Sequence, residues 1–343
     1  MHSLGTIKCD PILYLIYPGR AQDRPSCAYS NETAHVLDPQ PDPAAISAVR
    51  TVKRTRSILP AEDALGALTF RGIGPAISSG RVADVAVDPR NRSVWYVATA
   101  SGGLWKTQNR GLTFAPIFER GAYSMSAVLI DPKNSNTIWL ATGENTNLRS
   151  AIAGQGVFKS RDAGASWQFV GLGLTEKIGR IAIDPGNSEV VYVAAQGPLW
   201  AAGGERGLYK TSNGGTTWSR VLHVSENTGI SDIVIDPRTP NVLYAAAYQR
   251  RRHVGMLIGG GPEGAIYTST DAGTTWRKLA AGLPTGDIGR IGLALSPQNP
   301  DVVYATIAAQ GTNGGFFRSA DRGESWMKQS EWVSGGPQYY GEI

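Results

Sequence analysis

The chain has 343 residues, a formal net charge of +5, 41% hydrophobic residues and 18% charged residues, an ordinary balance for a globular protein with a sizeable core. Its 42 glycines and 9 tryptophans favour many short strands joined by tight turns. With four histidines and no G-x-S-x-G, H-E-x-x-H, P-loop or C-x-x-C pattern, the sequence excludes the common motifs of serine hydrolases, zinc proteases and P-loop nucleotide binding, and no basic stripe indicates nucleic acid.

Residues 1–64 are expected to be a poorly ordered leader or linker. Both cysteines, Cys9 and Cys27, lie in this segment, so the remaining chain is expected to use no disulfide. The apolar run at 12–17 is shorter than that of a usual signal peptide, and far below the roughly 20 residues that span a bilayer. The basic stretch RTVKRTR at 50–56 is interpreted as a solvated linker.

The body of the chain, residues 65–343, repeats a unit of roughly fifty residues. Each unit contains an Asp-Pro or Ser-Pro turn, an apolar run such as VVYVAAQ, a segment such as GLYKT and a closing phrase close to S-x-D-x-G-x-T-W. Proline ends the first predicted strand, and the apolar run predicts a second strand buried on both faces. The closing phrase occurs as TQNRGLTF (107–114), SRDAGASW (160–167), TSNGGTTW (211–218), STDAGTTW (269–276) and SADRGESW (319–326).

Four antiparallel strands repeated around an axis form the blades of a β-propeller. The sequence therefore predicts an all-β fold, a β-propeller of four-stranded antiparallel blades with five complete blades and a truncated sixth. The stretch LTFRGIGPAISSGRV (68–82) resembles a fourth strand that runs into the next first strand, so it could close the ring. Because the repeat is cut after Trp326, we expect a fragment of a longer protein with further blades or domains.

The closing phrase resembles the Asp-box of sialidases and other bacterial neuraminidase-repeat (BNR) propellers. Together with D-P-x-N-P and Y-V-A-x-x-x-G-x-W/Y-K-T, it makes residues 68–343 most similar to the sortilin-type and xyloglucanase-like Asp-box propellers of bacterial secreted proteins. The resemblance implies the fold specifically and an activity much less so. It also implies a secreted or periplasmic location.

One position of the closing phrase carries either Asp or Asn. Asn cannot do acid–base chemistry, yet it accepts hydrogen bonds from turn amides as Asp does. We therefore interpret this position as a holder of the turn and not as a catalytic acid. Its occupants are Asn109, Asp162, Asn213, Asp271 and Asp321.

The loops after the second strands share the face opposite the closing phrases and vary most in length, as binding surfaces on repetitive scaffolds do. Three consecutive arginines in one of them repel one another unless an acidic group meets them, which favours a partner there. Solvated loop decoration is the alternative. The candidate ligand- or partner-binding residues are Glu144, Asn145, Arg149, Trp200, Glu205, Arg206, Arg250, Arg251, Arg252 and His253.

Two enzyme classes can be tested against the sequence. A sialidase needs an arginine triad, and Arg81, Arg180 and Arg290 lie at unequal distances before their turns, so the sequence gives such a triad weak support. FRGIGP, with Arg71, matches the family's F-R-I-P phrase imperfectly.

A xyloglucanase-like hydrolase needs two carboxylates that flank the glycosidic bond. The family pattern Y-A-R-T-D-x-G-G-A-Y aligns with YVATASGGLW, and Ala100 stands where the catalytic Asp would be. The family's second carboxylate comes from another propeller, expected outside this chain. Glu144, Glu205 and Glu263 could form a different pair, although their spacing does not require it.

The sequence favours a sortilin-like recognition scaffold that binds a protein, a peptide or a carbohydrate. The alternative is a glycoside hydrolase domain, xyloglucanase- or sialidase-like, whose catalytic partner lies outside this chain. We assign no catalytic residue, cofactor or metal ligand, and we expect neither a nucleic-acid partner nor a membrane span.

Overall fold

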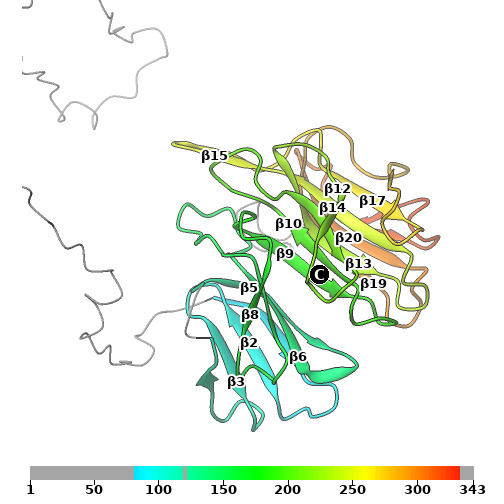
Figure 1. Ribbon diagram of the computed structural model, residues 1–343. Helices are drawn as coiled ribbons and strands as arrows, with labels where there is room; N and C mark the ends of the chain where they lie inside the picture. Colours follow the sequence, from blue (N-terminus) through cyan, green and yellow to red (C-terminus); the bar gives the residue numbers. More distant parts are fainter. Residues whose placement is uncertain (1–80, 119–121, 333–343) are drawn as a thin grey trace, which may run out of the picture. The chain divides into compact units, whose positions relative to one another are not determined.

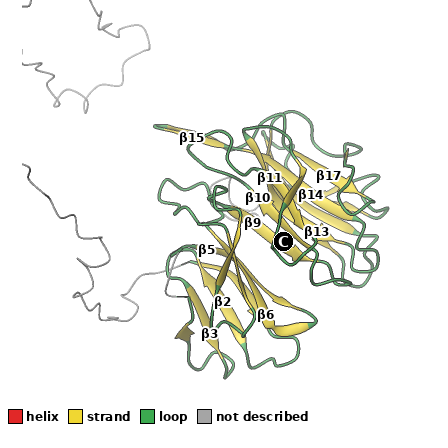
Figure 2. Cartoon of the chain, viewed as in Figure 1, coloured by secondary structure: helices red, strands yellow, loops and turns green. Residues whose placement is uncertain are grey.

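The computed structural model describes residues 81–118 and 122–332 (Figure 1). All the described residues belong to one compact unit of the chain. They form strands and loops without a helix, which confirms the predicted all-β fold (Figure 2). The expected leader, nearly all of the ring-closing stretch and the last residues of the expected sixth blade lie outside the described residues.

The described residues form five four-stranded antiparallel sheets and one two-stranded hairpin. The first sheet contains β1 (Val82–Val87), β2 (Trp95–Thr99), β3 (Leu104–Thr107) and β4 (Ala115–Pro116). The second contains β5 (Met125–Asp131), β6 (Asn134–Thr142), β7 (Val157–Ser160) and β8 (Gln168–Gly171). The third contains β9 (Ile178–Ile183), β10 (Val191–Ala195), β11 (Gly207–Thr211) and β12 (Ser219–Leu222).

The fourth sheet contains β13 (Thr228–Ile235), β14 (Leu243–Gln249), β17 (Ala265–Ser269) and β18 (Arg277–Lys278). The fifth contains β19 (Ile288–Leu295), β20 (Val303–Ala309), β21 (Gly315–Ser319) and β22 (Met327–Ser330). The hairpin of β15 (Arg251–His253) and β16 (Met256–Ile258) is inserted between β14 and β17. The sequence predicts only a long loop there, so the hairpin is a difference between the structure and the expectation.

Within each sheet the strands lie side by side in chain order, which is the meander of a propeller blade. The first strands β1, β5, β9, β13 and β19 together line two adjoining cavities, so they are the innermost strands. The sheets lie where the sequence predicts the five complete blades. The total number of blades stays a prediction, since the expected sixth falls largely on residues that are not described.

Apolar side chains fill the interfaces between consecutive sheets. Between the third and fourth sheets, Tyr192 and Leu208 pack with Ile233 and Leu243, all of them buried. The second strand β10 is buried along its whole length, as its unbroken apolar sequence predicts. Burial of this kind, at about 25 cal/mol per Å² of apolar surface, is the main stabilising term of the fold.

Two innermost strands carry an aspartate that bonds the neighbouring sheet. Asp84 in β1 accepts the N–H of Val128 in β5 at 2.9 Å, and Asp232 in β13 accepts the N–H of Leu293 in β19 at 2.8 Å. Both aspartates lie at a register shift in their strand pairing. Such a bulge leaves a backbone group outside the regular ladder and re-aims the side chain. The carboxylates therefore link inner strands that belong to different sheets.

A second link joins the closing-phrase turn of the second, third, fourth and fifth sheets to the sheet before it. The hydroxyl of Tyr192 and the ammonium of Lys210 both donate to the carbonyl of Ala272, at 3.0 and 2.8 Å. Ala272 has a φ of 57°, which turns its carbonyl toward these donors. Burial raises the pKa of Tyr192 to about 12, so its hydroxyl remains a donor. The equivalent contacts of the first sheet run from Tyr96 and Lys106 to Ala163.

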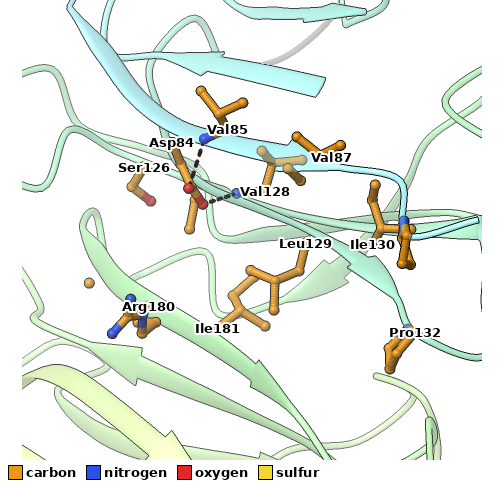
Figure 3. A pocket seen from close by; sticks show the side chains of 14 residues that line it. Asp84, Val85, Val87, Ser126, Val128, Leu129, Ile130, Pro132, Arg180 and Ile181 are labelled. Atoms are coloured by element: carbon orange, nitrogen blue, oxygen red, sulfur yellow. Dashed lines mark hydrogen bonds between the residues drawn. The ribbon is translucent and has the colours of Figure 1, made fainter. Parts of the chain in front are cut away.

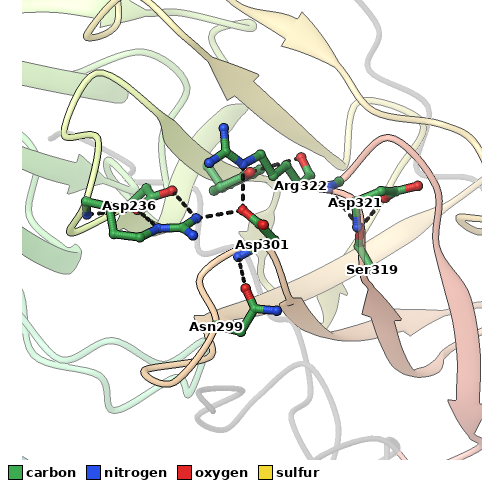
Figure 4. Close-up of polar contacts among 9 residues, drawn as sticks. Asp236, Asn299, Asp301, Ser319, Asp321 and Arg322 are labelled. Atoms are coloured by element: carbon green, nitrogen blue, oxygen red, sulfur yellow. Dashed lines mark hydrogen bonds and ion pairs between the residues drawn. The ribbon is translucent and has the colours of Figure 1, made fainter.

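An ion-pair network ties the turns of the fourth and fifth sheets (Figure 4). Asp301 binds Arg238 and Arg322, each at 2.7 Å, and Arg238 also reaches Asp236 at 3.0 Å. Both arginines and Asp301 are exposed to solvent, so water and salt screen the attraction. The network fixes the geometry of the two turns and contributes little to the stability of the fold.

Candidate functional site

The closing-phrase turns are held by one repeated set of hydrogen bonds. The Oδ1 of Asp162 accepts the N–H of Ser166 and the hydroxyl of Ser160, both at 2.8 Å. The Oδ1 of Asn213 accepts the N–H of Thr217 at 2.9 Å, and its Nδ2 donates to the Thr217 hydroxyl at 2.8 Å. The amide thus makes the same backbone contact as the carboxylate. The corresponding contacts occur at Asn109, Asp271 and Asp321.

On the opposite face, the loop after β6 reaches across the inner strands; we call residues 143–149 the axial loop. The backbone carbonyl of Asn145 accepts a hydrogen bond from Arg290 of β19 at 2.8 Å. The side-chain amide of Asn145 donates to the carbonyl of Gly179 in β9 at 3.2 Å. The side chain of Gln196, beyond β10, also donates to Asn145. A loop of the second sheet thereby contacts the third and fifth sheets.

Asn147 extends the same loop to the fourth sheet. Its side-chain oxygen accepts from Arg250 at 2.9 Å, and its backbone carbonyl accepts from Arg252 at 3.0 Å. Its amide also contacts the hydroxyl of Tyr248. Asn147 is fully buried, as are Asn145 and Glu144. The axial loop is therefore an internal link among the sheets, with most of its polar groups turned inward.

The arginines of the predicted surface are mostly buried. Arg206 and Arg250 have no exposed surface, and Arg252 is 4% exposed. Arg206 donates to the carbonyls of Gln196 and Ala201, at 2.6 and 2.8 Å. Burial, followed by repulsion from a neighbouring arginine, lowers the pKa of Arg250 to about 9 and that of Arg206 to about 10. Carbonyl and amide oxygens meet these guanidinium groups in place of the acidic partner that the sequence suggested.

The remaining candidates reach the surface. Trp200 is 46% exposed, and the guanidinium of Arg252 lies 6.0 Å from its ring centroid. Arg149 and His253 are exposed, and Arg251 donates to the side chain of Asn227 at 3.0 Å. These side chains come from the loops after β6, β10 and β14, which brings three second-strand loops to one surface.

The carboxylates considered for catalysis are each engaged by another group. Glu144 is buried in an ion pair with Arg81. Glu205 accepts the N–H of Leu174 at 2.7 Å, and Glu263 accepts the hydroxyl of Ser225 at 2.5 Å. Ala100, at the position of the family's catalytic Asp, is fully buried. The described residues thus offer no obvious acid–base pair on this face.

The three arginines weighed as a sialidase triad bind separate groups. Arg81 pairs with Glu144, Arg180 pairs with Asp232 at 2.8 Å, and Arg290 donates to a carbonyl of the axial loop. Across the described part of the chain, no group of three or more His, Cys, Asp or Glu residues is arranged to hold a metal ion. Among the same residues, no helix is long and apolar enough to cross a membrane.

Several residues at the centre of the structure were not predicted. Lys177 is buried beneath the axial loop, donates to the carbonyl of Ile152 at 3.1 Å, and has its pKa lowered to about 7, chiefly by burial. Gln196 and Tyr248 hold the same loop. The sequence carries no local signal that Lys177 and Tyr248 contact the same loop. Lys177 lies directly before a predicted first strand, and Tyr248 lies at the end of a predicted second strand.

Comparison with known proteins gives xyloglucanases as relatives. The chain is 25% identical over 322 residues to a xyloglucanase of Hypocrea jecorina, covering 83% of this chain and 36% of that protein. It is 26% identical over 271 residues to a xyloglucanase of Paenibacillus sp., covering 76% of this chain and 22% of that protein. The chain thus spans about a third or less of these relatives' length. No family model matches it.

Solved structures support the fold. The crystal structure of an ancestral GH74 enzyme superposes with a TM-score of 0.56 and 22% identity over 72% of this chain and 33% of the enzyme. The GH74 enzyme of Niastella koreensis superposes with a TM-score of 0.53 and 20% identity over 73% of this chain and 38% of the enzyme. At these identities the likeness shows a propeller-type fold and leaves the activity open.

Proposed function

We propose that the chain is a propeller of a xyloglucanase-type glycoside hydrolase and binds a polysaccharide such as xyloglucan across its second-strand loops. The observation that carries this proposal is the similarity of 83% of the chain to the Hypocrea jecorina xyloglucanase. The alternative weighed from the sequence thereby replaces the sortilin-like scaffold as the preferred function. Because the proposed substrate is a polysaccharide, we keep the secreted or periplasmic location as part of the proposal.

The exposed surface offers groups suited to a glycan. Trp200 presents an aromatic face on which the C–H groups of a sugar ring can pack. Arg149, Arg251 and His253, from loops of the same face, supply polar atoms for sugar hydroxyls. The buried Arg206 and Arg250 hold the loops in place.

Catalysis would require carboxylates from elsewhere. Glycoside hydrolysis uses an acid and a base or nucleophile on either side of the scissile bond. Ala100 cannot serve, and Glu144, Glu205 and Glu263 already accept bonds from neighbouring groups. We therefore assign this chain the binding of the polysaccharide, and the catalytic pair to residues outside the described ones.

The burial of Arg250 and Arg252 weakens the protein-recognition alternative. An arginine patch that captures an acidic peptide must present its guanidinium groups to solvent, and these two are turned into the molecule. Carbohydrate is the partner that the remaining exposed residues and the relatives favour.

The test is a calorimetric titration of the chain with xyloglucan oligosaccharides, with mannan oligosaccharides as the comparison glycan. The Trp200→Ala variant should bind xyloglucan about tenfold more weakly, a loss of about 1.4 kcal/mol. Trp332→Ala removes another exposed tryptophan, 62% exposed, and should leave the affinity unchanged. Equal binding by both variants, or no binding by the unmodified chain, would contradict the proposal.

A further inference from the structure

The innermost strands enclose a cavity that the proposed glycan surface does not use. Its volume is about 450 Å³, and it is lined by β1, β5 and β9. A second cavity of about 500 Å³ shares Leu129, Arg180 and Ile181 with it and extends toward β13 and β19. We call the first the axial cavity. Its size lies within the range of small-molecule sites.

The walls and one end of the axial cavity differ in chemistry (Figure 3). Val87, Ile130 and Pro132 lie on one side of it, while Asp84 and Ser126 lie beside each other on the other side, with Arg180 below them in the view. Prolines of the Asp-Pro turns line it as well, so it belongs to the turn side of the sheets, opposite the second-strand loops. An apolar body with one polar end would match this division.

The polar end has an acceptor with unused capacity. Asp84 accepts two backbone N–H groups, from Val85 at 2.8 Å and Val128 at 2.9 Å, and an ionised carboxylate can accept about four hydrogen bonds. Burial is the largest influence on its pKa and raises it. Arg180, the cation nearest in the lining, pairs with Asp232 at 2.8 Å. Asp84 and Arg180 are the charged residues of the lining, and Asp232, which lies outside the lining, balances the charge of Arg180.

A second observation comes from Ser126. Ser126 lines the cavity and is 4% exposed. Its hydroxyl is buried and has no hydrogen-bond partner among the described residues. A buried hydroxyl left unpaired carries a desolvation penalty, and a bound polar group would remove it. A carboxylate beside an unpaired hydroxyl is suited to a group with several N–H donors.

We propose that the axial cavity binds a ligand that joins a protonated amine to an apolar body. The ammonium donates to Asp84 and to the hydroxyl of Ser126, and the apolar body lies against Val87, Ile130 and Pro132. Either a free organic amine or the amino terminus of an apolar peptide supplies this chemistry. The site is independent of the glycan surface and stands if that proposal fails.

The experiment compares hexylamine, hexanol and hexanoate in calorimetric titrations of the full chain. Hexylamine should bind at one site, and hexanol and hexanoate about tenfold or more weakly. The dipeptide amide Leu-Leu-NH₂ and its N-acetylated form separate the two sources. Tighter binding by the dipeptide amide than by hexylamine, lost on acetylation, assigns the site to a peptide terminus, and the reverse order assigns it to a free amine.

Variants locate the site. Asp84→Asn keeps an oxygen for the backbone N–H groups and removes the charge, so it should weaken hexylamine binding about tenfold. Val87→Trp, at a side chain 45% exposed, should block the cavity without disturbing the core. Asp162→Asn removes the same charge at a turn outside the cavity and should change nothing. Any of three results would overturn the proposal. Hexanoate binds as tightly as hexylamine, hexylamine does not bind at all, or neither Asp84→Asn nor Val87→Trp weakens its binding.

Discussion

At the scale of single residues, the closing phrase shows how a residue that looks catalytic can be structural. Asp162 directs its oxygens to Ser160 and Ser166 within its own turn. Hydroxyl and backbone donors from Ser166 lower its pKa to about 2, which is the opposite of what a general acid near neutral pH needs. Asn213 makes the same backbone contact without an ionisable group.

Acid stability should therefore depend on which turns carry Asp. Asp162, Asp271 and Asp321 each have a pKa lowered to about 2 from 3.8, so their contribution is present above about pH 4 and is lost as the pH falls toward 2. A triple Asp→Asn variant at these positions should lose less thermal stability between about pH 5 and pH 2 than the unmodified chain. Melting curves across this range measure the effect, with Asp287→Asn in an exposed loop as the control. A triple variant that loses as much stability as the unmodified chain would contradict the account.

At the scale of elements, each sheet is joined to the next by donors that the repeat itself supplies. The tyrosine of the second strand and the lysine of the third meet one carbonyl of the following turn, as Tyr192 and Lys210 do at Ala272. In the second sheet a tryptophan replaces the tyrosine, and Lys159 lies 4.5 Å from the ring centroid of Trp139 while donating to Gly214 at 3.1 Å. The lysine link thus persists where the hydroxyl is lost.

Tyr192→Phe removes one such link and leaves the ring in place. The loss of its hydrogen bond to Ala272 should lower the free energy of unfolding by about 1 kcal/mol, since Lys210 still satisfies the carbonyl. Tyr304→Phe, at the equivalent position of the fifth sheet, where Tyr304 stacks on Phe316, should have a smaller effect. Urea unfolding of both variants measures the difference, and a larger loss for Tyr304→Phe would contradict the assignment.

The elements were predictable from the sequence because their signals are local. The Asp-Pro turn, the apolar run and the closing phrase lie within one repeat, and the five sheets occur where these phrases place them. The burial of Arg250 was not predictable, since its partner Asn147 lies 103 residues away. The sequence predicts that Arg250 and Asn147 both lie in loops after second strands. Whether the two loops meet depends on how the second and fourth sheets are arranged in space, which no local pattern encodes.

At the scale of the whole molecule, the axial loop joins separate sheets, and its Glu144 also pairs with Arg81, directly before β1 of the first sheet. It leaves the second sheet and contacts Gly179 of the third, Tyr248 of the fourth and Arg290 of the fifth. Polar groups carry these contacts in a buried setting, where each must be paired to avoid a desolvation penalty. The loop therefore makes the inner ends of separate sheets depend on one another.

Asn147→Ala tests this dependence. It leaves the buried guanidinium of Arg250 without one acceptor and should lower the free energy of unfolding by about 2–4 kcal/mol. Asn227→Ala is the matched control, because Asn227 binds Arg251 at an exposed site at 3.0 Å and its loss should cost less than about 0.5 kcal/mol. Urea unfolding distinguishes them, and equal losses would show that the axial loop does not stabilise the molecule.

The central claim is that a polysaccharide binds on the second-strand loops and not on the closing-phrase turns. Hydrogen–deuterium exchange of the full chain, with and without a xyloglucan oligosaccharide, tests this claim most directly. The account predicts slower exchange at 148–156, 196–207 and 248–265, with no change in the turns at 160–167, 211–218 and 269–276. Protection confined to those turns, or no protection at a saturating oligosaccharide concentration, would contradict it.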